Sequence, residues 1–209
     1  MRLDRAGLPF IGGTAALATA AALTVGYAGA VPLVLLTGFF AYFFRDPDRL
    51  PPAHTDLVVL SPADGRVLVA GPADPSAAPP GAWKQISIFL SPMDAHVNRS
   101  PVSGRVTWVD FRRGKYLPAY HRDAAAANER SEIWIDHHGR TIVFRQIVGI
   151  LARRVVCRVQ PGAELTAGQR FGIMKFGSRM DVFLPPEATL NVSVGDKVIA
   201  GETVIASLK

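Results

Sequence analysis

The sequence predicts a mainly β protein, a compact barrel or sandwich of repeated hairpins (a barrel-sandwich hybrid) that follows an N-terminal helical membrane anchor. Two observations predict this fold class. Residues 6–44 carry no charged side chain, and after the linker RDPDRLPPAHTD the chain alternates short β-type runs with turn residues. We therefore assign residues 1–46 to the anchor and the start of the linker, and residues 47–209 to a β domain.

The anchor is predicted from length and composition. Its 39 uncharged residues could supply two short spans or one long span, because one helix across a bilayer needs about 20 residues. A hairpin bend would fall in GYAGAVP, residues 26–32. Arginines flank the run on both sides: Arg2, Arg5, Arg45 and Arg49. A hairpin would place both flanks on the cytoplasmic side, as the positive-inside tendency favours, and a single span would not.

Two alternatives to a retained anchor are open. A cleaved secretory signal is suggested by the basic start MRLDR and by Ala28-Gly29-Ala30, although a second apolar run, VPLVLLTGFFAYFF, would then stay on the mature protein. A buried core helix is the other alternative, but helices that are apolar on all sides are unusual in a protein of this size.

Charge and cysteine content restrict the possible partners. The net charge of +6 and the pI of about 9.9 suit a surface that meets anionic lipid headgroups. Nucleic acid is not expected as a partner, because the arginines are scattered and no aromatic-basic motif occurs. The single cysteine, Cys157, excludes an intramolecular disulfide and argues against a cysteine-built metal site. We expect it to be a small core residue.

Internal repeats define the hairpins of the β domain. SPADGRV (61–67) recurs as SPVSGRV (100–106) with five of seven positions identical, and VQPGAELTAGQRFG (159–172) is echoed by VSVGDKVIAGETVI (192–205). Each unit reads as strand, turn, strand, so related hairpins should face one another. Outside the anchor, the helix candidate is a short Ala-rich stretch at 121–130 with Asp123 near its start, and 71–83 reads as a flexible surface loop.

These hairpins resemble those of biotinyl and lipoyl carrier domains. A carrier would present a lysine at a hairpin tip. Lys197, in VGDKVIAG, is one residue past a turn and lacks the Met-Lys flank of carriers, whereas Lys175 follows a Met but lies two residues before Gly177-Ser178. A membrane-tethered, non-cleaving carrier-like binding domain is the alternative to an enzyme.

Four stretches place reactive groups beside turn-forming residues: SPADG (61–65), LSPMDAHVNRSP (90–101), NER (128–130) and FGSRMD (176–181). Taken singly, each has a structural explanation. Asp64 would belong to a hairpin turn, Asp94 would cap a turn, and Gly177-Ser178 would be a bulge or tight turn in the strand-like run 170–185. The remaining histidines are interpreted as surface residues: His54, His121, His137 and His138.

Taken together, the stretches match a family. The order FFRDPDR, SPADG, LSPMDAHVNRSPVSG, NER, QIVGILARRVVC, FGSRMDVFLP closely resembles the short, membrane-anchored (archaeal-type) phosphatidylserine decarboxylase proenzymes. The resemblance runs from about Phe43 to the C-terminus, and the apolar N-terminus agrees with it. The motif FGSR between strand residues is highly specific for this family when SPADG and DAHVNR occur in the same chain.

The resemblance implies self-cleavage between Gly177 and Ser178 into chains 1–177 and 178–209, which stay together as a heterodimer. Ser178 becomes a covalent pyruvoyl cofactor, which forms a Schiff base with the amine of phosphatidylserine in the membrane. Loss of CO2 then yields phosphatidylethanolamine, a step of phospholipid biosynthesis, and no metal is implied. The implied location is the cytoplasmic membrane, with the catalytic domain facing the cytoplasm. A pyruvoyl decarboxylase of another amino-acid headgroup or of a soluble amino acid is the alternative within this chemistry.

The resemblance also implies roles for individual residues. Asp64 of SPADG works with a histidine in activating Ser178, and His96 is the histidine we assign. Arg99 stands where the longer bacterial enzymes have a second histidine, so the base for self-cleavage is open between His96 and Asp64. Candidates for binding the substrate phosphate are basic residues: Arg99, Arg130 and Arg179.

Overall fold

The computed structural model describes residues 2–150, 155–175 and 177–208. Residues 151–154 of the QIVGILARRVVC motif and Phe176 of the FGSR motif lie outside the described residues. The chain divides into two compact units. The N-terminal unit comprises Met1–Asp48 together with Ala95–Val97, and the β domain comprises Arg49–Asp94 together with Asn98–Lys209.

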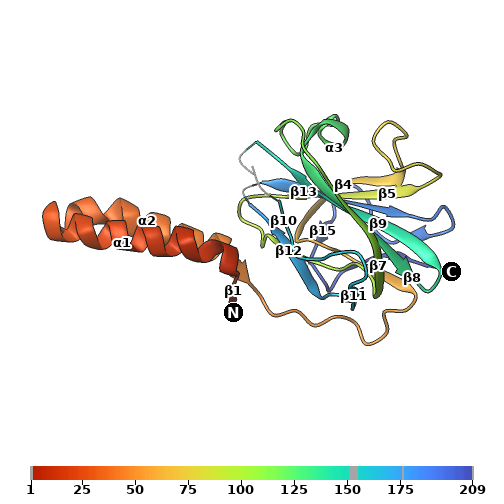
Figure 1. Cartoon of the computed structure of the whole chain (residues 1–209), viewed down its shortest axis with the longest axis horizontal. Helices are drawn as coiled ribbons and strands as arrows, with labels where there is room; N and C mark the ends of the chain where they lie inside the picture. Colours follow the sequence, from red (N-terminus) through yellow and green to blue (C-terminus); the bar gives the residue numbers. More distant parts are fainter. Residues whose placement is uncertain (1, 151–154, 176, 209) are drawn as a thin grey trace. The chain divides into compact units, whose positions relative to one another are not determined.

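Two antiparallel helices make up most of the N-terminal unit, and they lie side by side (Figure 1). Thr37 Oγ1 donates to Thr14 Oγ1 across the pair at 2.9 Å, and the rings of Phe10 and Phe40 lie 5.4 Å apart. The apolar run therefore forms a helical hairpin. Its elements are β1 (Arg2–Leu3), the 3-10 helix η1 (Arg5–Gly7), α1 (Leu8–Thr24), α2 (Tyr27–Phe43) and β2 (Arg45–Asp46), and β1 pairs with β2.

The hairpin bend is shorter than the sequence suggested. It is confined to Val25 and Gly26, and the helix α2 continues through Pro32, which was expected to lie in the bend. Proline removes one backbone hydrogen bond from a helix interior, and apolar membrane helices contain it more often than soluble helices do.

Both helices expose large apolar side chains. Leu17, Leu23, Val34 and Leu35 are between 57% and 84% exposed. The segment Arg5–Thr24 is long and apolar enough to cross a membrane by length and composition, whereas α2 has 17 residues and is shorter. Such surface is unfavourable in water and compatible with hydrocarbon, so the N-terminal unit has the properties of a membrane anchor.

Strands dominate the β domain, as predicted, and they are short and antiparallel. They are β3 (Val58–Leu60), β4 (Gly65–Pro72), β5 (Lys84–Leu90), β6 (Val97–Arg99), β7 (Gly104–Arg112), β8 (Arg130–His137), β9 (Arg140–Val148), β10 (Val155–Cys157), β11 (Glu164–Leu165), β12 (Arg170–Met174), β13 (Ser178–Leu184), β14 (Thr189–Leu190), β15 (Lys197–Val198) and β16 (Val204–Ser207). One eight-stranded sheet has the order β11-β7-β8-β9-β13-β5-β4-β15, and two three-stranded sheets have the orders β10-β12-β6 and β14-β16-β3. The large sheet is curled (Figure 1).

The internal repeats occupy equivalent places at the two edges of the large sheet. SPADGRV leads into β4, whose start pairs with β15, and SPVSGRV leads into β7, whose start pairs with β11. The glycine of each repeat lies where a neighbouring strand passes very close. An added Cβ would lie 2.1 Å from the carbonyl oxygen of Phe89 at Gly65 and 2.1 Å from that of Asp136 at Gly104. The repeats therefore occupy equivalent places, as predicted. The two strands of each repeat lie in different sheets and do not pair with each other, so the repeats are not the hairpins that the sequence suggested.

The two faces of the large sheet differ in chemistry. The inner face carries the apolar core, to which β13 contributes Met180, Val182 and Leu184. The other face carries buried charged pairs, including Arg145 with Glu132. The chain between β4 and β5 was predicted to be a flexible surface loop. One of its residues, Ala77, is nevertheless buried on this face against Ala125 and Ile147. Because successive side chains of a strand point to opposite faces, the apolar core on one face accounts for the alternating apolar residues in the sequence of these strands.

Two local expectations are corrected. The Ala-rich helix is a single turn, α3 (Ala124–Ala127), because Arg130 already begins β8. His137, interpreted as a surface residue, is buried. Its ring nitrogens lie 2.6 Å from the carbonyl oxygen of Ser103 and 2.9 Å from that of Asp56, so it joins β8 to two loops.

Candidate active site

The Gly-Ser pair lies at the start of the central strand of the large sheet. Ser178 is the first residue of β13 and pairs with Leu90 of β5 on one side and Val148 of β9 on the other. Gly177 precedes it with a φ of +74°, and a Cβ added there would meet no atom within 4 Å. The requirement for glycine is therefore conformational rather than steric, since side chains resist this left-handed backbone.

The hydroxyl of Ser178 is buried and has no hydrogen-bond partner among the described residues. A buried polar group without a partner costs about 1–3 kcal/mol, and such groups in native proteins have a specific cause, of which a catalytic role is one. β12 ends at Met174 and β13 begins in another sheet, so the interruption in the strand-like run is a crossover and not a bulge within one strand.

Asp64 lies at the same end of the large sheet. It directly precedes β4, in which Arg66 pairs with Phe89 of β5, the neighbour of Leu90. Because β4 and β13 flank β5, Asp64 and Ser178 are separated by two strand spacings, roughly 10 Å. This distance exceeds the reach of a direct hydrogen bond.

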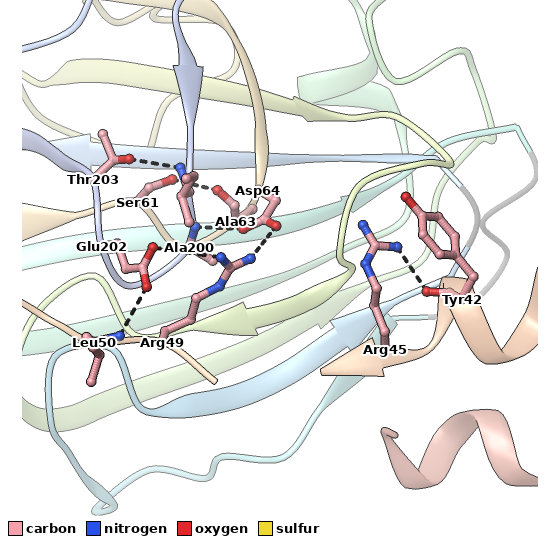
Figure 2. A network of polar contacts seen from close by, with 11 residues as sticks. Tyr42, Arg45, Arg49, Leu50, Ser61, Ala63, Asp64, Ala200, Glu202 and Thr203 are labelled. Carbon is pink, nitrogen blue, oxygen red and sulfur yellow. Dashed lines mark hydrogen bonds and ion pairs between the residues drawn. The ribbon is translucent and has the colours of Figure 1, made fainter. Parts of the chain in front are cut away.

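A charged network holds the carboxylate of Asp64 (Figure 2). Arg49 Nη2 donates to Oδ2 at 2.6 Å, and the backbone N–H of Ala200 donates to Oδ1 at 2.8 Å. Both charged side chains are largely buried, with 15% of Arg49 and 16% of Asp64 exposed. Arg49 Nη1 also lies 3.7 Å from Oε2 of Glu202, whose other oxygen accepts the N–H of Leu50 at 3.1 Å. The carboxylate therefore has a fixed orientation.

Arg49 contacts the candidate residue Asp64, which the sequence did not reveal. It was interpreted as a positive flank of the anchor, yet it pairs with a residue 15 positions away and contacts another near the C-terminus. The expected spacing rules for ion pairs apply within one helix or strand, so no local pattern could have indicated this partner.

The stretch LSPMDAHVNRSP follows β5. The N–H of Ser91 donates to Oδ2 of Asp94 at 2.7 Å, so Asp94 caps a turn. His96 belongs to the N-terminal unit, where it is buried and its ring lies 4.1 Å from that of Phe43. In the β domain, Asn98 Oδ1 accepts a hydrogen bond from Gln146 Nε2 at 2.8 Å.

The NER stretch lies beside the Gly-Ser pair. The N–H of Val148, the partner of Ser178, donates to the carbonyl oxygen of Glu129 at 3.0 Å. Asn128 Nδ2 donates to the carbonyl oxygens of Val148 at 2.8 Å and Leu117 at 2.9 Å, and its Oδ1 accepts the N–H of Leu117 at 2.9 Å. Asn128 thus joins the loop before α3 to the end of β9 by hydrogen bonds.

The three candidate phosphate-binding arginines have different surroundings. Arg99 is 5% exposed and donates to the carbonyl oxygen of Gly168 at 3.0 Å. Arg179 is 4% exposed and donates to Oδ1 of Asp181 at 2.6 Å, on the sheet face opposite to Ser178.

Arg130 lies in another environment. Its Nη1 donates to the carbonyl oxygen of Ala126 at 2.8 Å, and its buried Nε has no partner within the described part of the chain. Burial lowers the pKa of Arg130, and the neighbouring charges of Arg145 and Arg112 lower it further. An anion beside Arg130 would oppose both effects.

Two pockets open near the Gly-Ser pair and share Phe89. A pocket of about 690 Å³ with polar and apolar lining contains Asp64 and Asp94. An apolar pocket of about 370 Å³ lies against Gly177 and is lined by Phe89, Pro92, Pro118, Ala119, Tyr120, Gly149 and Ile150. Because Phe89 lines both pockets, a space that contains carboxylates adjoins an apolar space, which suits an amphipathic substrate.

Comparison with known proteins gives a consistent result. The family model described as phosphatidylserine decarboxylase matches residues 36–206. A phosphatidylserine decarboxylase proenzyme of Solibacter usitatus is 42% identical over 194 residues, which cover 91% of each chain. The proenzyme of Nitrosomonas europaea is 41% identical over 205 residues, which cover 98% of this chain and 94% of the relative.

A third relative, the proenzyme of Paramagnetospirillum magneticum, is 43% identical over an alignment of 219 residues that covers 99% of this chain and 87% of the relative. The identity thus exceeds 40% over nearly the whole chain. The chain therefore belongs to the phosphatidylserine decarboxylase family.

Proposed function

We propose that the chain is a proenzyme that cuts itself between Gly177 and Ser178 and then decarboxylates phosphatidylserine to phosphatidylethanolamine and CO2. The family supports the reaction, because its members are named for it. One observation carries the cleavage: Ser178 Oγ is buried without a hydrogen-bond partner among the described residues, directly after a glycine of left-handed conformation.

Self-cleavage takes three chemical steps. Oγ of Ser178 attacks the carbonyl carbon of Gly177, which exchanges the amide for an ester and frees the backbone nitrogen. β-Elimination then removes the Cα proton of residue 178 and breaks the Cβ–Oγ bond, leaving a carboxylate on Gly177 and dehydroalanine at residue 178. Tautomerisation and addition of water release ammonia, and residue 178 ends as a pyruvoyl group.

The residues present fit this group. Only a serine gives pyruvoyl by loss of an oxygen leaving group, since threonine would add a methyl group and cysteine would have to lose sulfur. Gly177 adopts a φ of +74°, a backbone conformation that glycine reaches without the strain other residues would meet. The pyruvoyl group supplies an electron sink for the pair that the substrate releases with CO2.

Asp64 is the residue we assign to activation of the Ser178 hydroxyl. From the family resemblance, we assign His96 as the histidine that acts with Asp64. A histidine near neutral pKa also suits delivery of the proton that replaces CO2. Arg49 keeps the carboxylate of Asp64 oriented through the 2.6 Å hydrogen bond.

The substrate phosphate needs a cationic partner. Among Arg99, Arg130 and Arg179, Arg130 is favoured, because its Nε–H has no partner among the described residues and its charge is incompletely balanced. Arg99 and Arg179 remain candidates with donors already engaged by protein oxygens.

The two cleavage products should remain one folded molecule. Chain 178–209 begins with β13, which is paired on both sides, and also supplies β15 to β4 and β16 to β3. Its apolar side chains, including Val182 and Ile205, are part of the core. Separation would expose these strands and this core together.

The membrane location is proposed from the anchor and its flanks. The helical hairpin would return the chain to the side from which it entered. Positive residues at both ends, Arg2, Arg5 and Arg45, favour the cytoplasmic side. The β domain would then face the cytoplasm at the surface of the cytoplasmic membrane.

Denaturing electrophoresis of the purified chain tests the proposal. The wild type should give a fragment of residues 178–209, and the Ser178→Ala variant should stay intact. A decarboxylation assay on vesicles that contain phosphatidylserine, or lipids with other amino-acid headgroups, then identifies the substrate. An intact wild-type chain without decarboxylase activity would support the carrier-like alternative.

A further inference from the structure

Exposed apolar side chains gather around the apolar pocket beside Gly177. Tyr120 and Ile150 line this pocket and are nevertheless 65% and 53% exposed. Met93 adjoins the pocket residue Pro92 and is 54% exposed. The ring of Tyr120 also packs edge-on against Phe89 at 6.0 Å. Two segments far apart in sequence therefore present exposed apolar groups at this pocket, and Met93, from a third, lines the pocket that contains Asp64.

The surroundings of this surface are basic and amphipathic. Arg113, Lys115 and Arg122 are exposed on the same segment as Tyr120, and Tyr116 on that segment is 41% exposed. Two carboxylates are near in sequence. Asp94 caps its own turn, and Asp123 lies 3.6 Å from Arg122. Tyrosines and aliphatic residues bordered by basic groups are typical of proteins that bind the headgroup layer of a membrane.

We propose that the surface formed by Met93, Tyr120 and Ile150 docks onto a lipid bilayer, so that the apolar pocket beside Gly177 opens into the headgroup layer. The inference rests on the proposed function and adds the route by which a lipid reaches residue 178. A lipid could place its headgroup at the site while its acyl chains stay largely in the membrane.

A bilayer is favoured over a protein partner for two reasons. The chain carries its own apolar helix, and residues tethered to a membrane meet it at a high effective concentration. The pocket wall is apolar, and the chain segment that carries Tyr120 also carries exposed cationic residues, which complements a lipid with an anionic headgroup.

The docking test uses the full-length chain with Cys157 replaced by alanine and one new cysteine that carries an environment-sensitive dye. Tyr120→Cys and Ile150→Cys probe the surface. Glu187→Cys is the matched control, because it is exposed and follows the opposite end of β13. Each is reconstituted in vesicles of phosphatidylcholine and phosphatidylglycerol, with and without spin-labelled acyl chains.

We expect a blue shift and quenching by the spin label at positions 120 and 150, and neither at position 187. Equal, unquenched emission at all three positions would overturn the proposal. A blue shift without quenching would also overturn it, because it would indicate burial against protein, either a second copy or another partner. Repeating the measurement with Ser178→Ala makes the result independent of self-cleavage.

A kinetic measurement gives a second test. Tyr120→Glu and Ile150→Glu should lower turnover of vesicle-bound phosphatidylserine about tenfold more than turnover of a short-chain, water-soluble phosphatidylserine. Thr107→Glu, an exposed residue of β7, is the control. Equal losses on both substrates would contradict docking. If no variant, including wild type, is cleaved or active, the proposed function fails while the dye measurement still decides the docking surface.

Discussion

Replacing Asp64 by asparagine removes one charge from the network behind the Gly-Ser pair and changes little in volume. The carboxylate accepts hydrogen bonds from Arg49 at 2.6 Å and from the N–H of Ala200 at 2.8 Å. Asparagine can still accept one of them, but the ion pair is lost and Arg49 retains Glu202, at 3.7 Å, as its acidic partner in the described network.

The magnitudes separate an effect on catalysis from an effect on folding. Loss of a hydrogen bond to a charged group costs about 1.5–3 kcal/mol, which is less than the stability of about 5–15 kcal/mol of a typical domain. Loss of general-base assistance slows a reaction by about 10²- to 10⁴-fold. Asp64→Asn should therefore yield a folded chain whose self-cleavage is about 10²- to 10⁴-fold slower than that of the wild type.

A pulse-chase experiment measures this directly. The appearance of the 178–209 fragment is followed by denaturing electrophoresis, and the thermal unfolding midpoint of the uncut chain checks the fold. Glu187→Gln, an exposed acidic residue, is the matched control and should mature at the wild-type rate. Normal maturation of Asp64→Asn would refute the role assigned to this carboxylate, and a folded but slow variant would support it.

Three further predictions follow from the same geometry. Arg49→Gln keeps the carboxylate but loses its 2.6 Å partner, so maturation in the pulse-chase assay should slow by about 10- to 100-fold, and a wild-type rate would remove Arg49 from the site. His96→Ala should depress decarboxylation of phosphatidylserine in matured protein, and full activity would exclude it as the proton donor. Burial raises the pKa of the Cys157 thiol, so at pH 7–8 the reactive thiolate is scarcer than in a free cysteine. Alkylation by iodoacetamide should therefore be slower than in the denatured chain, and equal rates would contradict this.

Much of the fold could be predicted because the decisive signals are local. An uncharged run of 39 residues specifies an apolar hairpin whatever follows it. The SPADGRV and SPVSGRV repeats fix two equivalent strand starts, since each needs a glycine where a carbonyl oxygen approaches within 2.1 Å of the would-be Cβ. The buried pair of Arg179 and Asp181 also follows from sequence in retrospect, because residues two apart in a strand share a face.

The parts that could not be predicted depend on contacts between distant segments. The partnership of Arg49 with Asp64 and Glu202 joins three segments, and the apolar pocket beside Gly177 is built from four. His137 was misinterpreted for the same reason, since the two carbonyl groups that hold it come from loops 34 and 81 positions away. Composition around each residue carries no information about such partners.

Mass spectrometry of the purified full-length protein tests the central claim most directly. Cleavage at Gly177-Ser178 predicts a C-terminal fragment of residues 178–209 that is lighter than the serine-initiated peptide by one ammonia, as a pyruvoyl group requires. It also predicts an N-terminal fragment that ends in Gly177. A continuous polypeptide with an unmodified serine at position 178 would contradict the proposed maturation and the chemistry that depends on it.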